Sequence, residues 1–141
     1  MDIRSVMTPD PATCQASTPI RDVARLMLYN DCGLVPVIDE TGKPVGTVTD
    51  RDIALRVVAE GRDVQECTAQ DCMTSPVTTV SLDSNLAETT DLMEREQVRR
   101  MLVVDQDGRL CGIVAQADIA LSGRDRRTAD LVEKVSQPQQ H

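Results

Sequence analysis

The fold is decided by a ten-residue pattern that occurs twice, as Gly46-Thr47-Val48-Thr49-Asp50-Arg51-Asp52-Ile53-Ala54-Leu55 and as Gly112-Ile113-Val114-Ala115-Gln116-Ala117-Asp118-Ile119-Ala120-Leu121. The two copies lie 66 positions apart, and at that offset residues 6–55 align with residues 72–121 without a gap. Further identities at the same offset are Met7 with Met73 and Asp39 with Asp105. Matches at one constant spacing indicate that the chain is a tandem duplication.

Both repeats predict the same order of elements, β-α-β-β-α. In the first repeat we expect a strand at 12–15, a helix from Thr18-Pro19, strands at 34–39 and 45–48, and a helix at 50–60. In the second repeat we expect a strand at 77–80, a helix from 83, strands at 101–105 and 110–114, and a helix from 116 to 121. Thr18 is the expected N-cap of its helix, with Pro19 as the first helical residue. Gly42 and Gly108 supply the positive φ that hairpin turns require.

These elements predict the organisation of the chain. We expect repeat 1 over 1–61, a polar linker over 62–71, repeat 2 over 72–122, and a polar extension over 123–141 that is helical in part and then disordered. A half of roughly 50 residues has little core of its own. We therefore predict an α/β (α+β) fold in which the two repeats pack with pseudo-two-fold symmetry into one domain.

Composition and charge exclude several classes of function. The 141 residues carry 15 Lys and Arg against 23 Asp and Glu, a net charge of −8, which disfavours nucleic-acid binding. The single His is His141, so we expect neither catalytic residues nor a metal site, and we do not expect an enzyme. No apolar run reaches the ~20 residues of a membrane span, and the first residues do not resemble a signal peptide, so we expect a cytoplasmic protein without membrane contact.

The cysteines form no recognisable framework. There are five, an odd number, and no pair has the C-x-x-C spacing. They are Cys14, Cys32, Cys67, Cys72 and Cys111. We interpret them as small core residues, with redox sensing or a single disulfide as the alternatives.

In these features the chain resembles tandem CBS domains, the pair known as a Bateman module. Gly46–Asp52 fits the family's ribose-phosphate motif G-h-x-S/T-x-x-D completely, and Gly112–Asp118 fits except at Ala115. The resemblance covers residues 1–121. It implies a regulatory module, without catalytic residues or a required cofactor, that binds AMP, ADP, ATP, S-adenosylmethionine or sometimes NAD between the repeats. It also implies a homodimer, and regulation would add an effector protein that the sequence does not identify.

The first motif has a chemistry that can be argued from its residues. Gly46 allows close backbone approach at the end of a strand. The Asp52 carboxylate can accept hydrogen bonds from both hydroxyls of a ribose, and Thr49 can donate to a ligand oxygen. The alternative is that Thr49 and Asp52 form a capping box, which needs no ligand.

Two further residues favour the ligand interpretation. Asp118 keeps the carboxylate in the second motif although Ala115 has removed the capping partner. Arg51 lies in the first helical turn, where the helix dipole disfavours a cation unless an anion is near. Arg51 can also be a solvated charge balanced by the neighbouring aspartates.

The resemblance implies that each cleft combines the T-x-x-D loop of one repeat with the first strand of the other and the entry to its second strand. The ligand-binding residues expected in the first cleft are Thr49, Arg51, Asp52, Thr78, Thr79, Arg99, Arg100 and Met101. A second, weaker cleft would use Asp118 with Thr13, Gly33, Leu34 and Val35. Adenine would lie between aliphatic side chains, namely Val77, Met101 and Val103. Arg99 and Arg100 would meet phosphate, or they are surface charges paired with Glu94 or Glu96.

Two functions compete at this stage. The first is a sensor that binds an adenine nucleotide or another adenosine derivative in the cleft between the repeats. The second is a structural interaction module, whose clefts hold side chains and whose helices mediate dimerisation.

Overall fold

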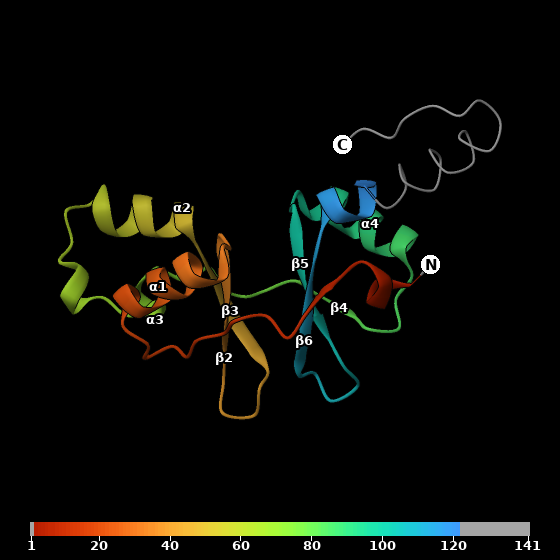
Figure 1. The fold of residues 1–141 in the computed structure, drawn as a ribbon, viewed down its shortest axis with the longest axis horizontal. Coiled ribbons are helices and arrows are strands. Elements are labelled where there is room, and N and C mark those ends of the chain that lie inside the picture. Colours follow the sequence, from red (N-terminus) through yellow and green to blue (C-terminus); the bar gives the residue numbers. More distant parts are fainter. Residues whose placement is uncertain (1, 122–141) are drawn as a thin grey trace.

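The computed structural model describes residues 2–121, so the extension expected over 123–141 lies outside the described part of the chain. Two hairpins stand near the middle of the molecule, and their helices lie at its two far ends (Figure 1). The predicted mixed α/β fold with two β-α-β-β-α repeats is confirmed.

The first repeat builds one half of the molecule. It contains α1 (Ile20–Asn30), β2 (Leu34–Ile38), β3 (Pro44–Thr49) and α2 (Asp50–Ile53), which continues as a π-helical turn over Ala54–Val58. β2 and β3 pair antiparallel as a two-stranded sheet. Gly42 in their turn has φ +85°, as the hairpin prediction requires.

The second repeat builds the other half. It contains β4 (Thr79–Ser81), α4 (Leu86–Glu96), β5 (Arg100–Val104) and β6 (Leu110–Ala115), followed by helix at 116–121. β5 pairs parallel with β4 and antiparallel with β6, and Gly108 in the β5–β6 turn has φ +80°. The four-stranded sheet has the order β1-β6-β5-β4, and β1 (Thr8–Pro9) comes from the start of the chain.

Two local predictions about the first repeat are wrong. Pro19, not Thr18, is the N-cap of α1, because the Thr18 hydroxyl instead accepts a hydrogen bond from the Gln15 amide at 2.9 Å. The strand expected at 12–15 is reduced to a single parallel bridge between Cys14 and Val37. Its two backbone hydrogen bonds, with Pro36 and Ile38, still attach this segment to β2.

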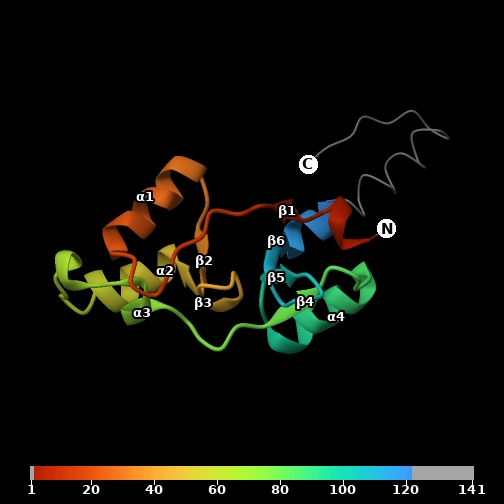
Figure 2. The same cartoon turned by 90° about the horizontal axis from the view of Figure 1, so that it is seen from below.

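The first residues of each repeat cross to the opposite half (Figure 2). Ile3 is buried in the core of the second half, against Met93 and Met101. Correspondingly, β1 pairs with β6, and Thr74 bridges Thr47 of β3. The two halves therefore share backbone hydrogen bonds as well as side-chain contacts.

The segment 62–71, expected as a polar linker, contains short helical elements and two buried residues. It contains a 3₁₀ turn (Val64–Glu66) and the start of α3 (Ala69–Cys72). Cys67 and Ala69 are buried in the core of the first half. Two backbone hydrogen bonds attach them to the start of α1: the Ile20 amide donates to the Cys67 carbonyl at 2.9 Å, and the Ala69 amide donates to the Thr18 carbonyl at 2.8 Å. Within residues 2–121, no helix is both long enough and apolar enough to cross a membrane.

Candidate functional site

A cavity of about 710 Å³, here called cleft 1, lies between the two halves. Its volume is within the ~300–1,000 Å³ range of small-molecule sites. The α2 end of the first repeat and the entries to β4 and β5 of the second repeat form its walls. It is lined by Leu34, Thr47, Thr49, Asp50, Arg51, Asp52, Thr74, Pro76, Val77, Thr78, Gln97, Val98, Arg99, Arg100 and Leu102.

A smaller cavity of about 370 Å³, here called cleft 2, opens beside the second motif. It is lined by Thr8, Asp10, Pro11, Ala12, Asn30, Cys32, Gly33, Leu34, Arg100, Ile113, Ala115 and Asp118. The two clefts are related by the duplication, because nearly every residue of cleft 2 has its counterpart 66 positions away in cleft 1. Thr8 corresponds to Thr74, and Asp118 corresponds to Asp52.

Thr49 and Asp52 form a reciprocal capping box at the start of α2. The Thr49 hydroxyl accepts from the Asp52 amide at 3.0 Å, and Asp52 Oδ2 accepts from the Thr49 amide at 2.9 Å. The capping interpretation is therefore confirmed. The capping box uses only one of the two carboxylate oxygens of Asp52. Within residues 2–121 no hydrogen bond reaches the other oxygen, Oδ1.

Three arginines, Arg51, Arg99 and Arg100, line cleft 1. All are exposed, and among the described residues none of them forms a salt bridge, so the pairing of Arg99 or Arg100 with Glu94 or Glu96 is absent there. Only two carboxylates, Asp50 and Asp52, line the same cavity. Cleft 1 therefore has an excess of positive lining charge, although the whole chain is acidic.

Cleft 2 lacks most of these polar groups. Where cleft 1 has Thr49, Arg51, Thr78 and Arg99, the residues at the corresponding positions are Ala115, Ala117, Ala12 and Gly33. Its lining carboxylates are Asp10 and Asp118, against one arginine. The asymmetry expected between the clefts is thus present in their lining residues.

The structure brings six of the eight residues expected in the first cleft to cleft 1, and places two elsewhere. The six are Thr49, Arg51, Asp52, Thr78, Arg99 and Arg100. Thr79 pairs with Leu102 in the sheet and does not line the cavity. Met101 is buried in the core of the second half, because Arg100 and Leu102 on either side of it take the cleft-facing positions of the strand.

The same alternation changes the second cleft. Asp118, Gly33 and Leu34 line cleft 2, whereas Val35 is fully buried in the core of the first half. Thr13 lies in a separate open hollow near the hairpin turns. Of the side chains expected to flank adenine, Val77 lines cleft 1 and Val103 is buried in the core.

Several residues that line the clefts were not expected there from the sequence. Leu34 was expected only in cleft 2 and Arg100 only in cleft 1, but each lines both cavities. Thr47, Thr74 and Gln97 were not expected at all. The duplication carried a usable signal, because positions 34 and 100 are equivalent and a pair of equivalent positions can lie at the pseudo-two-fold axis.

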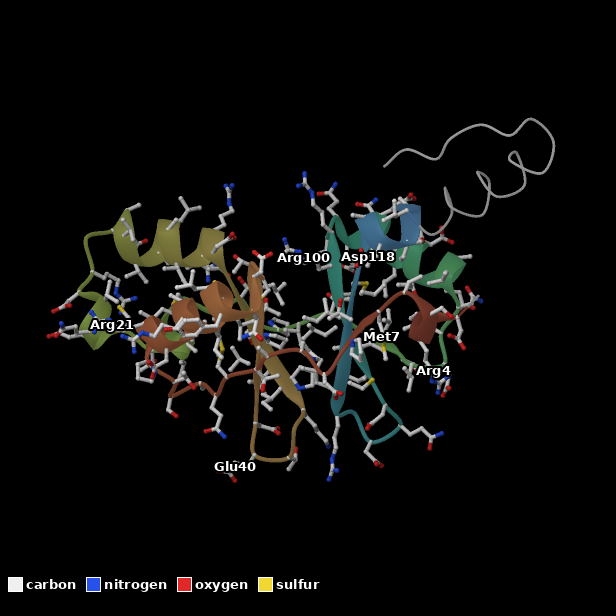
Figure 3. All side chains as sticks on the ribbon, viewed as in Figure 1. Arg4, Met7, Arg21, Glu40, Arg100 and Asp118 are labelled. Carbon is white, nitrogen blue, oxygen red and sulfur yellow. The ribbon has the colours of Figure 1, made fainter. Side chains whose placement is uncertain are left out.

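The close approach expected at Gly46 is present, and it recurs at Gly112. A Cβ on Gly46 would lie 2.6 Å from Met73 Sδ, and one on Gly112 would lie 2.6 Å from Met7 Sδ. Figure 3 shows Met7 beside the second half, on the segment that crosses from the first repeat. The crossing methionines, together with the backbone carbonyls of Thr74 and Thr8, therefore make this close approach.

The described residues hold no candidate metal centre. Within residues 2–121 no group of three or more His, Cys, Asp or Glu side chains could hold a metal ion. The five cysteines are free thiols. Burial, with a smaller contribution from Cys72, raises the pKa of Cys14 to about 11.

Two repeats that cross over and enclose a pair of related clefts define a tandem-repeat module. The family model of the CBS domain matches residues 3–59 and 69–123, and the chain belongs to this family as a tandem CBS domain pair. It is similar to the CBS domain-containing protein YhcV of Bacillus subtilis, with 35% identity over 127 residues that cover 90% of this chain and 89% of the relative.

Two similar solved structures contain adenosine compounds. One is the CBS domain pair of the protein MJ0100 in complex with 5′-methylthioadenosine and S-adenosyl-L-methionine, with TM-score 0.77, 26% identity and coverage of 87% of this chain and 99% of that one. The other is the CBS domain protein PAE2072 from Pyrobaculum aerophilum complexed with AMP, with TM-score 0.76, 27% identity and coverage of 86% and 97%.

The relatives differ in length, so this chain matches a different share of each one. The chain spans 57% of the length of an uncharacterized protein of Methanopyrus kandleri, to which it is 34% identical over 116 residues. It spans 24% of a homoserine O-acetyltransferase of Methanocorpusculum labreanum, to which it is 30% identical over 122 residues. CBS pairs related to this chain therefore make up most of some proteins and form one part of an enzyme in others.

Proposed function

We propose that this chain is a regulatory sensor that binds an adenine nucleotide or a related adenosine derivative in cleft 1. The observation that carries the proposal is the position of Asp52 in the same cavity as Arg99 and Arg100, with no hydrogen bond to its Oδ1 from the described residues. One wall can accept hydrogen bonds from ribose hydroxyls, and the other supplies cations for phosphate. The AMP in the Pyrobaculum aerophilum relative supports the ligand class.

The lining residues suggest an orientation for the ligand. The ribose would face Asp52 and Thr49, and the phosphates would face Arg99 and Arg100. Adenine would lie against the apolar part of the cavity, formed by Val77, Val98 and Leu102. Without an aromatic side chain in this lining, the base would be held by aliphatic contacts and by backbone groups.

The proposed role is ligand binding without catalysis. Among the described residues that line cleft 1, none pairs a nucleophile with a general base, which favours a nucleotide that acts as a regulatory ligand. Binding would change the affinity of the module for an effector protein or for an attached domain.

A thermal-shift and calorimetric series tests this function. AMP, ADP, ATP and S-adenosylmethionine are compared with GMP, which carries the same ribose and phosphate on a different base. A ligand at 100 times its dissociation constant adds about 2.7 kcal/mol to the free energy of unfolding. We expect at least one adenine compound, and not GMP, to raise the melting temperature. If no adenine compound does so, the sensor function is wrong.

A second candidate function is a protein-interaction module. Several large apolar side chains of the first half are exposed, among them Leu28 (73%), Tyr29 (76%), Leu55 (49%) and Val58 (67%). Exposed apolar groups on neighbouring helices are typical of protein interfaces. We propose that they form a homodimer contact, which is compatible with nucleotide binding in the clefts and becomes the main function if no ligand binds.

A further inference from the structure

We infer that a phosphorylated ligand in cleft 1 lowers the affinity of cleft 2 for a second phosphorylated ligand, because the two clefts share one arginine, Arg100. This inference rests on the function proposed above, and it concerns the relation between the clefts. Arg100 and Leu34 are the two lining residues common to both cavities. Figure 3 shows Arg100 between the two halves of the molecule, with Asp118 on the helix beside it.

The sharing follows from the duplication. Leu34 is the first residue of β2 and Arg100 is the first residue of β5, exactly one repeat length apart. Leu34 is opposite Thr49 in its hairpin, and Arg100 is opposite Ala115. Two equivalent positions that each touch both cavities lie next to the pseudo-two-fold axis. Only one of the two positions, position 100, carries a cationic side chain.

The lining charges make this single cation decisive for cleft 2. Cleft 1 has Arg51 and Arg99 in addition to Arg100. Cleft 2 has Arg100 as the only cation in its described lining, together with the carboxylates Asp10 and Asp118. Without Arg100, a phosphate in cleft 2 would face two carboxylates and no opposite charge.

One guanidinium cannot serve two phosphates equally. Arginine binds phosphate through a planar fork of N–H donors, so a bidentate contact with a ligand in cleft 1 occupies donors that a ligand in cleft 2 would otherwise use. A bound phosphate also offsets the guanidinium charge that the second ligand would need. A phosphate is bound more firmly in cleft 1, because Arg51 and Arg99 also line that cleft, so Arg100 would be engaged there first. An uncharged adenosine in cleft 2 would not suffer this penalty.

Titration of the full chain with AMP tests the inference. For the wild type we expect one tight equivalent and a second that binds at least tenfold more weakly. Leu34→Arg supplies a second arginine at the equivalent position. We expect it to tighten the second equivalent by at least tenfold, with a much smaller change in the first. Ala87→Arg adds the same charge at an exposed position of α4 that lines neither cleft, and it should leave both affinities unchanged.

Other results would overturn the inference. Two independent AMP equivalents of equal affinity in the wild type would show that Arg100 is not limiting. If Ala115→Thr tightens the second equivalent while Leu34→Arg does not, cleft 2 is weak because it lacks the hydroxyl and not because it shares the arginine. Leu34→Lys repeats the measurement if Leu34→Arg does not fold. Failure of AMP and every other adenine compound to bind the wild type would instead contradict the proposed function itself.

Discussion

Gly46 marks the point where the crossing segment of the second repeat touches the first. An alanine Cβ there would lie 2.6 Å from Met73 Sδ and 3.1 Å from the Thr74 carbonyl oxygen. The methionine end can move, but the carbonyl is held by the backbone pair between Thr74 and Thr47, at 2.8 and 3.0 Å. Overpacking at a constrained contact costs typically about 1–3 kcal/mol.

We therefore expect Gly46→Ala to lower the free energy of unfolding by about that amount in urea denaturation. In a double-mutant cycle, Gly46→Ala should cost less in a Met73→Ala background than in the wild type, because Met73→Ala removes the nearest atom. Gly112→Ala should behave alike, since its Cβ meets Met7 Sδ at 2.6 Å. An unchanged stability of both glycine variants would show that the crossing segments do not pack as described.

Asp52 and Asp118 occupy equivalent positions but have different surroundings. We expect Asp52→Ala to weaken binding of the adenine nucleotide by roughly tenfold to over a hundredfold, because each lost hydrogen bond to a charged group costs about 1.5–3 kcal/mol. Asp118→Ala should change the tight site far less, since it lines only cleft 2. Calorimetric titration of both variants measures the difference.

Because Asp52 also caps α2, its variant needs a separate control. Circular dichroism and thermal melting establish whether Asp52→Ala is folded. Arg99→Ala has no capping role and lines only cleft 1, so it should weaken AMP but affect unphosphorylated adenosine less. Loss of binding in Asp118→Ala with intact binding in Asp52→Ala would reverse the assignment of the clefts.

At the scale of elements, the hairpins were the most predictable part of the chain. Their turns carry Gly42 and Gly108, whose positive φ is a local requirement visible in the sequence. It was less predictable which residues of each strand face the cleft and which face the core. A strand presents alternate residues to one side, so an error of one residue exchanges Met101 for Leu102 in the cleft.

Contacts between the two halves could not be predicted from the local sequence pattern. Nothing near Met7 or Met73 indicates that each methionine packs on the glycine of the other repeat, because these contacts join residues far apart in the sequence. The capping box illustrates a different limit. Thr49 and Asp52 suit both a cap and a ribose, and residue type alone does not choose between them.

The segment around Cys14 couples the stability of the first half to pH. Burial raises the pKa of the Cys14 thiol from 9.0 to about 11. Between these values the unfolded chain releases a proton that the folded chain retains, so the stabilising effect is complete below pH 9.0 and is lost as pH approaches about 11. We expect the free energy of unfolding to fall over this interval in denaturant titrations.

Cys14→Ala isolates this contribution, because other groups also titrate at high pH. Its free energy of unfolding should fall less steeply above pH 9.0 than that of the wild type. At neutral pH the variant should be less stable, because it removes a buried side-chain atom. Parallel slopes for the two proteins would mean that the Cys14 thiol does not contribute to the pH dependence.

At the scale of the whole molecule, the two halves have different outer surfaces. Leu28 and Tyr29 are exposed at the end of α1, and their counterparts one repeat later are Glu94 and Arg95 on α4. Leu55 and Val58 extend the apolar surface of the first half onto the next helical segment. Both helices lie on the outer side of the β2–β3 hairpin (Figure 1). A homodimer would thus bury the first half of each copy against that of the other.

We expect light scattering at tens of micromolar to give the mass of a dimer. A two-fold contact places the same patch on both copies, so each substitution acts twice. Leu28→Glu with Tyr29→Arg gives α1 the residues of α4, and it should raise the dissociation constant of the dimer by at least tenfold. Ala87→Glu, on the exposed surface of α4, is the matched control and should leave the mass unchanged. A monomeric wild type, or a dimer that persists in the double variant, would show that this surface does not mediate self-association.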